Sequence, residues 1–115
     1  MRWLNTVSFH LLHPALILAA ARVEEVWKAN SALTCTITSA NDSDHMVGSA
    51  HYEGRALDFR IHGVVPPIQR ELATKVQAAL GPEFRVLLED SGGPNEHLHV
   101  EFRPHPVTIK ETTTI

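Results

Sequence analysis

Residues 49–58 read Ser49-Ala50-His51-Tyr52-Glu53-Gly54-Arg55-Ala56-Leu57-Asp58. The pattern is S-x-H-x-x-G-x-A-x-D, in which a histidine and an aspartate are separated by a glycine. Further along the chain, residues 96–99 read Glu96-His97-Leu98-His99. The two segments together offer imidazoles and carboxylates, and three such ligands with one open position make a hydrolytic zinc site. The spacing alone is a weak signal, so the remaining sequence must show whether the two segments meet.

Composition limits the class of protein. The chain has 115 residues, of which 43% are hydrophobic and 20% charged, and this suits one globular domain with a modest core. We expect a single domain over residues 1–115, with its core at about 14–103 and a tail at 104–115. The net charge of −3 predicts no nucleic-acid partner and no membrane partner. We also expect a monomer.

The single cysteine, Cys35, excludes an internal disulfide and a thiolate zinc cluster, so a metal must be held by His, Asp or Glu. Cys35 alternates with Leu33 and Ile37, which predicts a small buried residue and not a nucleophile. The apolar run from Leu11 to Ala21 loosely resembles a signal peptide. His13 and Pro14 interrupt it, however, which favours an amphipathic helix.

Periodicity predicts an α+β fold. Apolar residues recur at helical spacing over residues 14–30 and again over 66–80, where Gly81 and Pro82 follow as a stop signal. The expected inward positions of the two helices are Leu16, Ala20, Val23 and Trp27, then Ile68, Leu72, Val76 and Leu80. Alternating residues predict strands at 33–39, 55–62, 84–90 and 97–103. We expect a small antiparallel sheet of about four strands, with both helices packed on one face and the metal site on the other.

Strand side chains switch faces with every residue, and this places the candidate ligands. The apolar face of the two strands that carry the motifs would hold Leu57, Phe59, Ile61, Leu98, Val100 and Phe102. Asp58, His97 and His99 then point away from the helices. Because one face of an antiparallel sheet can stay solvated, we expect these side chains to converge on an accessible surface, with His51 approaching from the preceding loop.

The motifs resemble a known family. S-x-H-x-x-G-x-A-x-D followed by E-x-x-H, with an overlapping H-x-H, is similar to the zinc D-alanyl-D-alanine carboxypeptidases and related peptidoglycan endopeptidases. These belong to the lysostaphin-like and D,D-carboxypeptidase metallopeptidases, whose fold is shared with the hedgehog signalling domain. The motifs cover Ser49–Asp58 and Glu96–His99, and the expected element order over residues 14–103 is similar too.

The resemblance implies one Zn²⁺ ion and a peptidoglycan peptide as substrate. It makes His51, Asp58 and His99 the metal ligands. It also implies roles for three neighbours: Glu96 as general base, His97 as a residue that assists the transition state, and Ser49 as a residue that positions the substrate. Such a domain, with no clear signal sequence, suits either a phage endolysin released by a separate lysis protein or a cytoplasmic dipeptidase.

One departure from the family pattern bears on the substrate. Many members carry an arginine shortly after the first strand, in a segment like S-G-Y-R, whereas residues 39–42 here read Ser-Ala-Asn-Asp. Arg55, Arg60 and Arg103 are the candidates to replace it. The departure keeps a second function open, a non-catalytic zinc-binding module that uses the same scaffold for recognition.

Other polar groups have simpler explanations. The acidic set at Asp42, Asp44, Glu89 and Asp90 is typical of a calcium site in some relatives of this fold, but a solvated loop and strand end is the favoured interpretation. His62 has the same strand parity as Asp58, and a strand-end residue is favoured over a role beside the metal. For the motif residues taken jointly, their order and facing favour a metal site.

Overall fold

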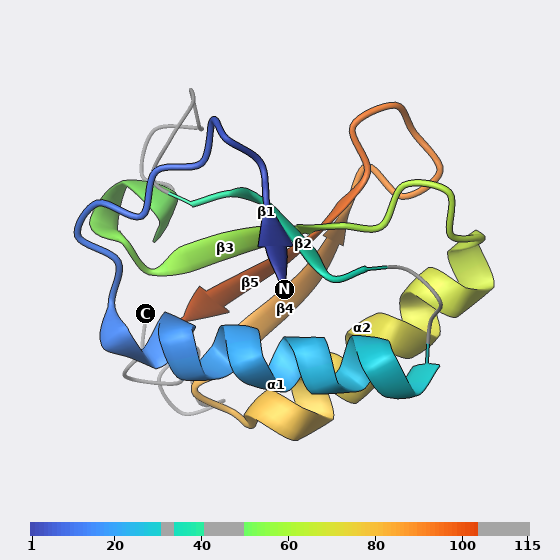
Figure 1. Ribbon diagram of the computed structural model, residues 1–115. Coiled ribbons are helices and arrows are strands. Elements are labelled where there is room, and N and C mark those ends of the chain that lie inside the picture. The colour runs from blue at the N-terminus through green and yellow to red at the C-terminus, as the bar shows by residue number, and fades with distance from the viewer. Residues whose placement is uncertain (31–33, 41–49, 104–115) are drawn as a thin grey trace, which may run out of the picture.

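The computed structural model describes residues 1–30, 34–40 and 50–103, with the elements shown in Figure 1. In chain order they are β1 (Arg2–Trp3), α1 (Pro14–Asn30), β2 (Thr36–Ser39), the short 3₁₀ helix η1 (Ala50–Glu53), β3 (Ala56–Arg60), α2 (Pro66–Leu80), β4 (Phe84–Glu89) and β5 (His97–Phe102). Within these residues, no helix combines the length and apolar character needed to cross a bilayer. The predicted Thr-rich tail lies outside the described residues.

The strands form one five-stranded sheet in the order β1-β2-β3-β5-β4. β1 runs parallel to β2, and every other pair is antiparallel. The α+β class is therefore confirmed, but the sheet is mixed and has one strand more than predicted. The additional strand, β1, is only two residues long, which is too short to show an alternating pattern in the sequence.

Both helices lie on the same side of the sheet (Figure 1). The core between them and the sheet contains Leu16, Ala19, Val23 and Trp27 of α1, Leu72, Val76 and Leu80 of α2, and Leu57, Phe59, Leu98 and Val100 of β3 and β5. On α1, Leu16, Val23 and Trp27 are buried as predicted. The fourth predicted residue, Ala20, is only partly buried, and its neighbour Ala19 is buried instead. The predicted facing of β3 and β5 is confirmed.

On α2, Gln69 takes the inward place predicted for Ile68. The Gln69 side chain is fully buried, whereas Ile68 is 39% exposed. Burial of the amide is possible because its Nε2 donates to the Val64 carbonyl at 2.8 Å and to Glu96 Oε1 at 2.6 Å, while its Oε1 accepts from Ser91 Oγ at 2.5 Å. Gln69 thus ties α2 to the loop between β4 and β5.

Gly54 holds η1 against the N-terminal segment. Its φ of +69° lies in the left-handed region that glycine adopts without strain. Its N–H donates to the His51 carbonyl at 3.0 Å, and its carbonyl accepts from the His13 N–H at 2.8 Å. An added Cβ would lie 2.0 Å from the Leu11 carbonyl oxygen, so only glycine fits at this position. This explains the glycine of the motif at residues 49–58.

Cys35 is 4% exposed and belongs to the core, as predicted. Burial raises the pKa of its thiol to about 12. We therefore expect the folded protein to resist a thiol reagent at pH 8, while protein in urea reacts fully.

Because the folded pKa of Cys35 lies above the unfolded value of about 8.5, the contribution of this thiol to stability is complete below pH 8.5 and declines as the pH rises toward the folded pKa. Urea unfolding at pH 8 and pH 10 measures the decline, and Cys35→Ala, which has no thiol, should show less of it. Rapid labelling of the Cys35 thiol in the folded protein at pH 8 would contradict the predicted resistance to the thiol reagent.

Candidate metal centre

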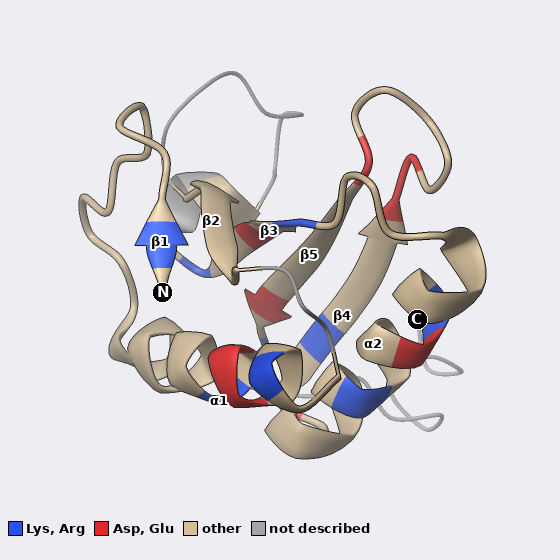
Figure 2. Cartoon of the chain, turned by 45° about the vertical axis from the view of Figure 1, so that its right-hand side comes forward, with Lys and Arg blue, Asp and Glu red and all other residues tan. Residues whose placement is uncertain are grey.

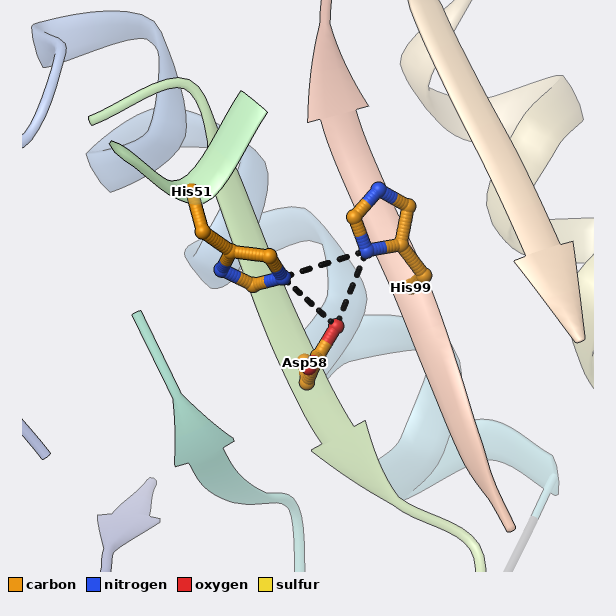
Figure 3. Close-up of side chains that lie close together, drawn as sticks. All are labelled: His51, Asp58 and His99. Carbon is orange, nitrogen blue, oxygen red and sulfur yellow. Dashed lines mark hydrogen bonds and ion pairs between the residues drawn. The ribbon is translucent and has the colours of Figure 1, made fainter. Parts of the chain in front are cut away.

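Three side chains from three elements meet beside the sheet (Figure 3). Asp58 on β3 and His99 on β5 are direct partners across the strand pair, so both project from the same face. His51 reaches them from η1. His51 Nε2 lies 3.1 Å from Asp58 Oδ1 and 3.3 Å from His99 Nδ1, and His99 Nδ1 lies 3.0 Å from Asp58 Oδ1. We call these three residues the metal cluster.

The outer nitrogen of each imidazole has an oxygen partner. His51 Nδ1 lies 2.5 Å from the Ala40 carbonyl oxygen, and His99 Nε2 lies 2.8 Å from Glu101 Oε1. Because a carbonyl or carboxylate oxygen can only accept, each outer nitrogen carries the proton, and the inner nitrogens of the neutral rings hold lone pairs. This arrangement is typical of metal-binding histidines, whose second N–H donates to such a group.

The titration of the cluster reflects the convergence of these lone pairs. Burial favours neutral Asp58, but the hydrogen bonds that His51 and His99 donate to Oδ1 when an inner nitrogen carries a proton outweigh burial and lower the pKa of the carboxyl below its usual range. Burial likewise opposes the charged form of His99, yet the hydrogen bonds to Asp58 and Glu101 prevail and raise its pKa. Both shifts have a common cause, the close contact between the Asp58 carboxylate and the His99 ring.

The distances suit a metal ion. Ligands about 2.0–2.1 Å from a tetrahedral zinc lie roughly 3.3 Å from one another, and the three atoms of the metal cluster are 3.0–3.3 Å apart. His51, Asp58 and His99 are 2%, 6% and 6% exposed. Buried His51, Asp58 and His99 can therefore bind a metal ion.

The predicted accessibility of the metal cluster is wrong. The ligands project from the face opposite the helices, as expected, but that face is not open to solvent at the cluster. The reason is η1, which contacts both β3 and β5 and brings His51 over them. A strand pattern shows which way a side chain points, but it does not reveal what covers that side chain.

Two carboxylates at the centre had no role in the predictions. Glu101 accepts a hydrogen bond from His99 Nε2 and another from Arg85 Nη2 at 3.1 Å. These two hydrogen bonds outweigh the effect of burial and lower the pKa of Glu101. Glu89, assigned to a solvated strand end, has its Oε1 3.4 Å from His99 Nδ1 and 3.5 Å from His97 Nε2. A sequence signal for both residues existed. Glu101 has the strand parity of His99, and the hairpin register across the Gly92-Gly93 turn places Glu89 opposite His97. Figure 2 shows the acidic segment where β4 ends. Asp42 and Asp44 lie outside the described residues.

The other predicted site residues are placed differently. His97 borders the metal cluster, with Nε2 3.7 Å from Asp58 Oδ2. Glu96 has the strand parity of Leu98 and turns to the helix side, where Gln69 Nε2 and the Gly92 N–H, at 3.1 Å, both donate to its Oε1. These hydrogen bonds lower the pKa of Glu96, that from Gln69 most. The structure thus does not bring Glu96 to the metal cluster. Ser49 lies outside the described residues.

The three candidate arginines also differ in position. Arg55 Nη1 donates to the Phe102 carbonyl at 2.8 Å, and Arg103 Nε lies 3.8 Å from Glu101 Oε2. Arg60 is exposed, is paired with His97 across the strands, and has the strand parity of Asp58. Of the three arginines, Arg60 is therefore the exposed one on the face that carries the metal cluster, where a bound molecule could meet it.

Comparisons with protein families, with characterised proteins and with solved structures found no match to this chain. The geometry of the metal cluster and the sequence motifs are therefore the grounds for a functional assignment.

Proposed function

We propose that the protein is a zinc-dependent metallopeptidase that hydrolyses peptide bonds in peptidoglycan stem peptides. The observation that carries the proposal is the metal cluster, in which two imidazole nitrogens and one carboxylate oxygen converge with their outer hydrogen bonds already made. Two histidines and one carboxylate are a ligand set of catalytic zinc sites. The substrate class rests on the resemblance of residues 49–58 and 96–99 to the peptidoglycan peptidases.

Each residue of the centre has a definite task. A zinc ion held by the metal cluster would polarise the scissile carbonyl and lower the pKa of a water molecule to about 7. Asp58 supplies negative charge, and its lowered pKa keeps it ionised at neutral pH. Glu101 orients His99 through the Nε2–H hydrogen bond. Arg60, exposed on the same face, supplies a positive charge for a substrate carboxylate.

A second function, a zinc-binding module without catalysis, is supported by one observation. The carboxylate of Glu96, which the family resemblance makes the general base, is hydrogen-bonded to Gln69 and Gly92 away from the metal cluster. A recognition module needs no proton acceptor beside its metal.

Zinc analysis combined with digestion of muropeptides tests the proposal. We expect one equivalent of zinc and cleavage of stem peptides, and product masses will show whether a terminal D-alanine is removed or an internal bond is cut. The His99→Ala variant should lose both zinc and activity, because it lacks one of three ligands. Stoichiometric zinc with no cleavage of any muropeptide would favour the recognition module. A wild type that binds no zinc would refute both functions.

A further inference from the structure

Glu89 lies beside the metal cluster and is partly exposed to solvent. In the β4–β5 pair it lies opposite His97, so its side chain projects from the same face as His97 and His99. Its Oε1 is 3.4 Å from His99 Nδ1, a ligand atom, and 3.5 Å from His97 Nε2. The side chain is 45% exposed, so it contacts the buried centre and remains within reach of a substrate.

Glu96 is held elsewhere by its own contacts. Its Oε1 accepts from Gln69 Nε2 at 2.6 Å and from the Gly92 N–H at 3.1 Å, and its Oε2 lies 3.4 Å from His62 Nδ1. Since Gln69 is fully buried and also bound to Val64 and Ser91, the Glu96 carboxylate is part of the link between α2 and the β4–β5 loop. To serve the metal cluster, Glu96 would have to break these bonds and cross to the other face of the sheet.

His97 lies next to Glu89 at the edge of the metal cluster. Its Nδ1 lies 2.8 Å from the Asn95 carbonyl oxygen, which only accepts, so Nδ1 carries the proton in the neutral ring. Its Nε2 then faces two carboxylate oxygens, Glu89 Oε1 at 3.5 Å and Asp58 Oδ2 at 3.7 Å. His97 therefore stands between the ligand Asp58 and Glu89.

We propose that Glu89, and not Glu96, is the carboxylate that moves the proton in the hydrolysis, an inference that rests on the proposed function. Glu89 Oε1 takes a proton from the attacking water as the water oxygen forms its bond to the scissile carbonyl carbon. The same oxygen returns the proton to the peptide nitrogen as the C–N bond breaks, so the carboxylate is regenerated and no further reactant is needed. Glu96 is then a structural residue of the β4–β5 loop.

Kinetics of matched amide variants test the inference. We expect Glu89→Gln to lower kcat by about 10²–10⁴-fold, the usual contribution of a positioned acid–base group, with one equivalent of zinc retained. Glu96→Gln should lower kcat far less and lower the melting temperature instead, and the exposed Glu83→Gln serves as the neutral control. Added formate should restore part of the kcat of Glu89→Ala, which a merely structural role would not allow. A larger loss of kcat in Glu96→Gln than in Glu89→Gln would overturn the inference and leave the proposed function intact.

A binding measurement separates this inference from the enzyme proposal. Acetohydroxamate gives up its N–O–H proton when it chelates a metal, so a nearby carboxylate that accepts the proton strengthens binding. We expect the cobalt-loaded Glu89→Gln variant to bind acetohydroxamate at least about 10-fold more weakly than the cobalt-loaded wild type, by visible absorption. The same result in a wild type that cleaves no peptide would support the proton-accepting role of Glu89 while refuting the peptidase. Equal acetohydroxamate binding by the wild type and Glu89→Gln would overturn the inference. So would a second equivalent of metal that the wild type binds and Glu89→Gln does not, because Glu89 would then be a metal ligand.

Discussion

Replacing His51 with alanine is expected to abolish tight zinc binding. The substitution removes one of three ligand atoms that lie within 3.3 Å of one another. The loss of affinity should exceed the roughly 10–100-fold that follows when only an outer hydrogen-bond partner of a ligand is removed. Titration of the metal-free protein with zinc in the presence of a competing chelator measures it. Zinc should also raise the melting temperature of the wild type, since a ligand at 100 times its Kd adds about 2.7 kcal/mol, and should not raise that of His51→Ala.

Two variants make this result specific to the metal cluster. His10→Ala removes an exposed histidine outside the cluster and should bind zinc as the wild type does. Glu101→Gln keeps the side-chain shape and an acceptor oxygen for His99 Nε2, so we expect a loss of only about 10-fold, at the low end for outer partners. His51→Ala protein that binds zinc with wild-type affinity would rule out His51 as a ligand.

Replacing Gly54 with alanine is expected to destabilise the protein by about 3 kcal/mol or more. Positive φ in a residue with a side chain costs about 1–2 kcal/mol, and the φ here is +69°. The added Cβ would also lie 2.0 Å from the Leu11 carbonyl oxygen, which is backbone and cannot rotate away. Relief requires η1 to move, so His51 should shift and zinc affinity should fall together with stability. Urea unfolding and zinc titration measure the two effects.

Gly63→Ala is the matched control. Gly63 has a φ of +88°, but nothing lies within 4 Å of an added Cβ. This variant should lose only the backbone preference, about 1–2 kcal/mol, and keep its zinc affinity. If the two variants lose equal stability, the contact with Leu11 is not what requires glycine at residue 54.

Alternation along single strands could be predicted from the sequence because it is local. Asp58 and His99 were placed on one face and Phe59 and Leu98 on the other, and the core contains Phe59 and Leu98 as expected. The same rule could not show what covers a face. His51 is held by the Ala40 carbonyl, eleven residues earlier in the chain, and this contact exists only after η1 has packed beside the end of β2.

The carboxylates show a second limit. Ile68 was predicted to face inward, and Gln69 is buried in its place because of bonds to Val64, Ser91 and Glu96, of which Ser91 and Glu96 lie 22 and 27 residues further along the chain. Without Gln69, nothing indicated that Glu96 has a partner on the helix side. The position of Glu89 beside His97 could have been predicted from the sequence, since it follows from the β4–β5 hairpin register alone.

Burial of His51 has a consequence for the speed of metal exchange. Because His51 is only 2% exposed, a competing chelator could approach a bound ion at its open position but could not replace His51 while η1 is closed. Exchange then waits for a local opening of residues 50–54, which are connected to the N-terminal segment by the hydrogen bond from the His13 N–H to the Gly54 carbonyl, among other contacts. We therefore expect the residence time of the metal to be governed by this opening, so that a protein loaded once stays loaded through long periods of metal scarcity.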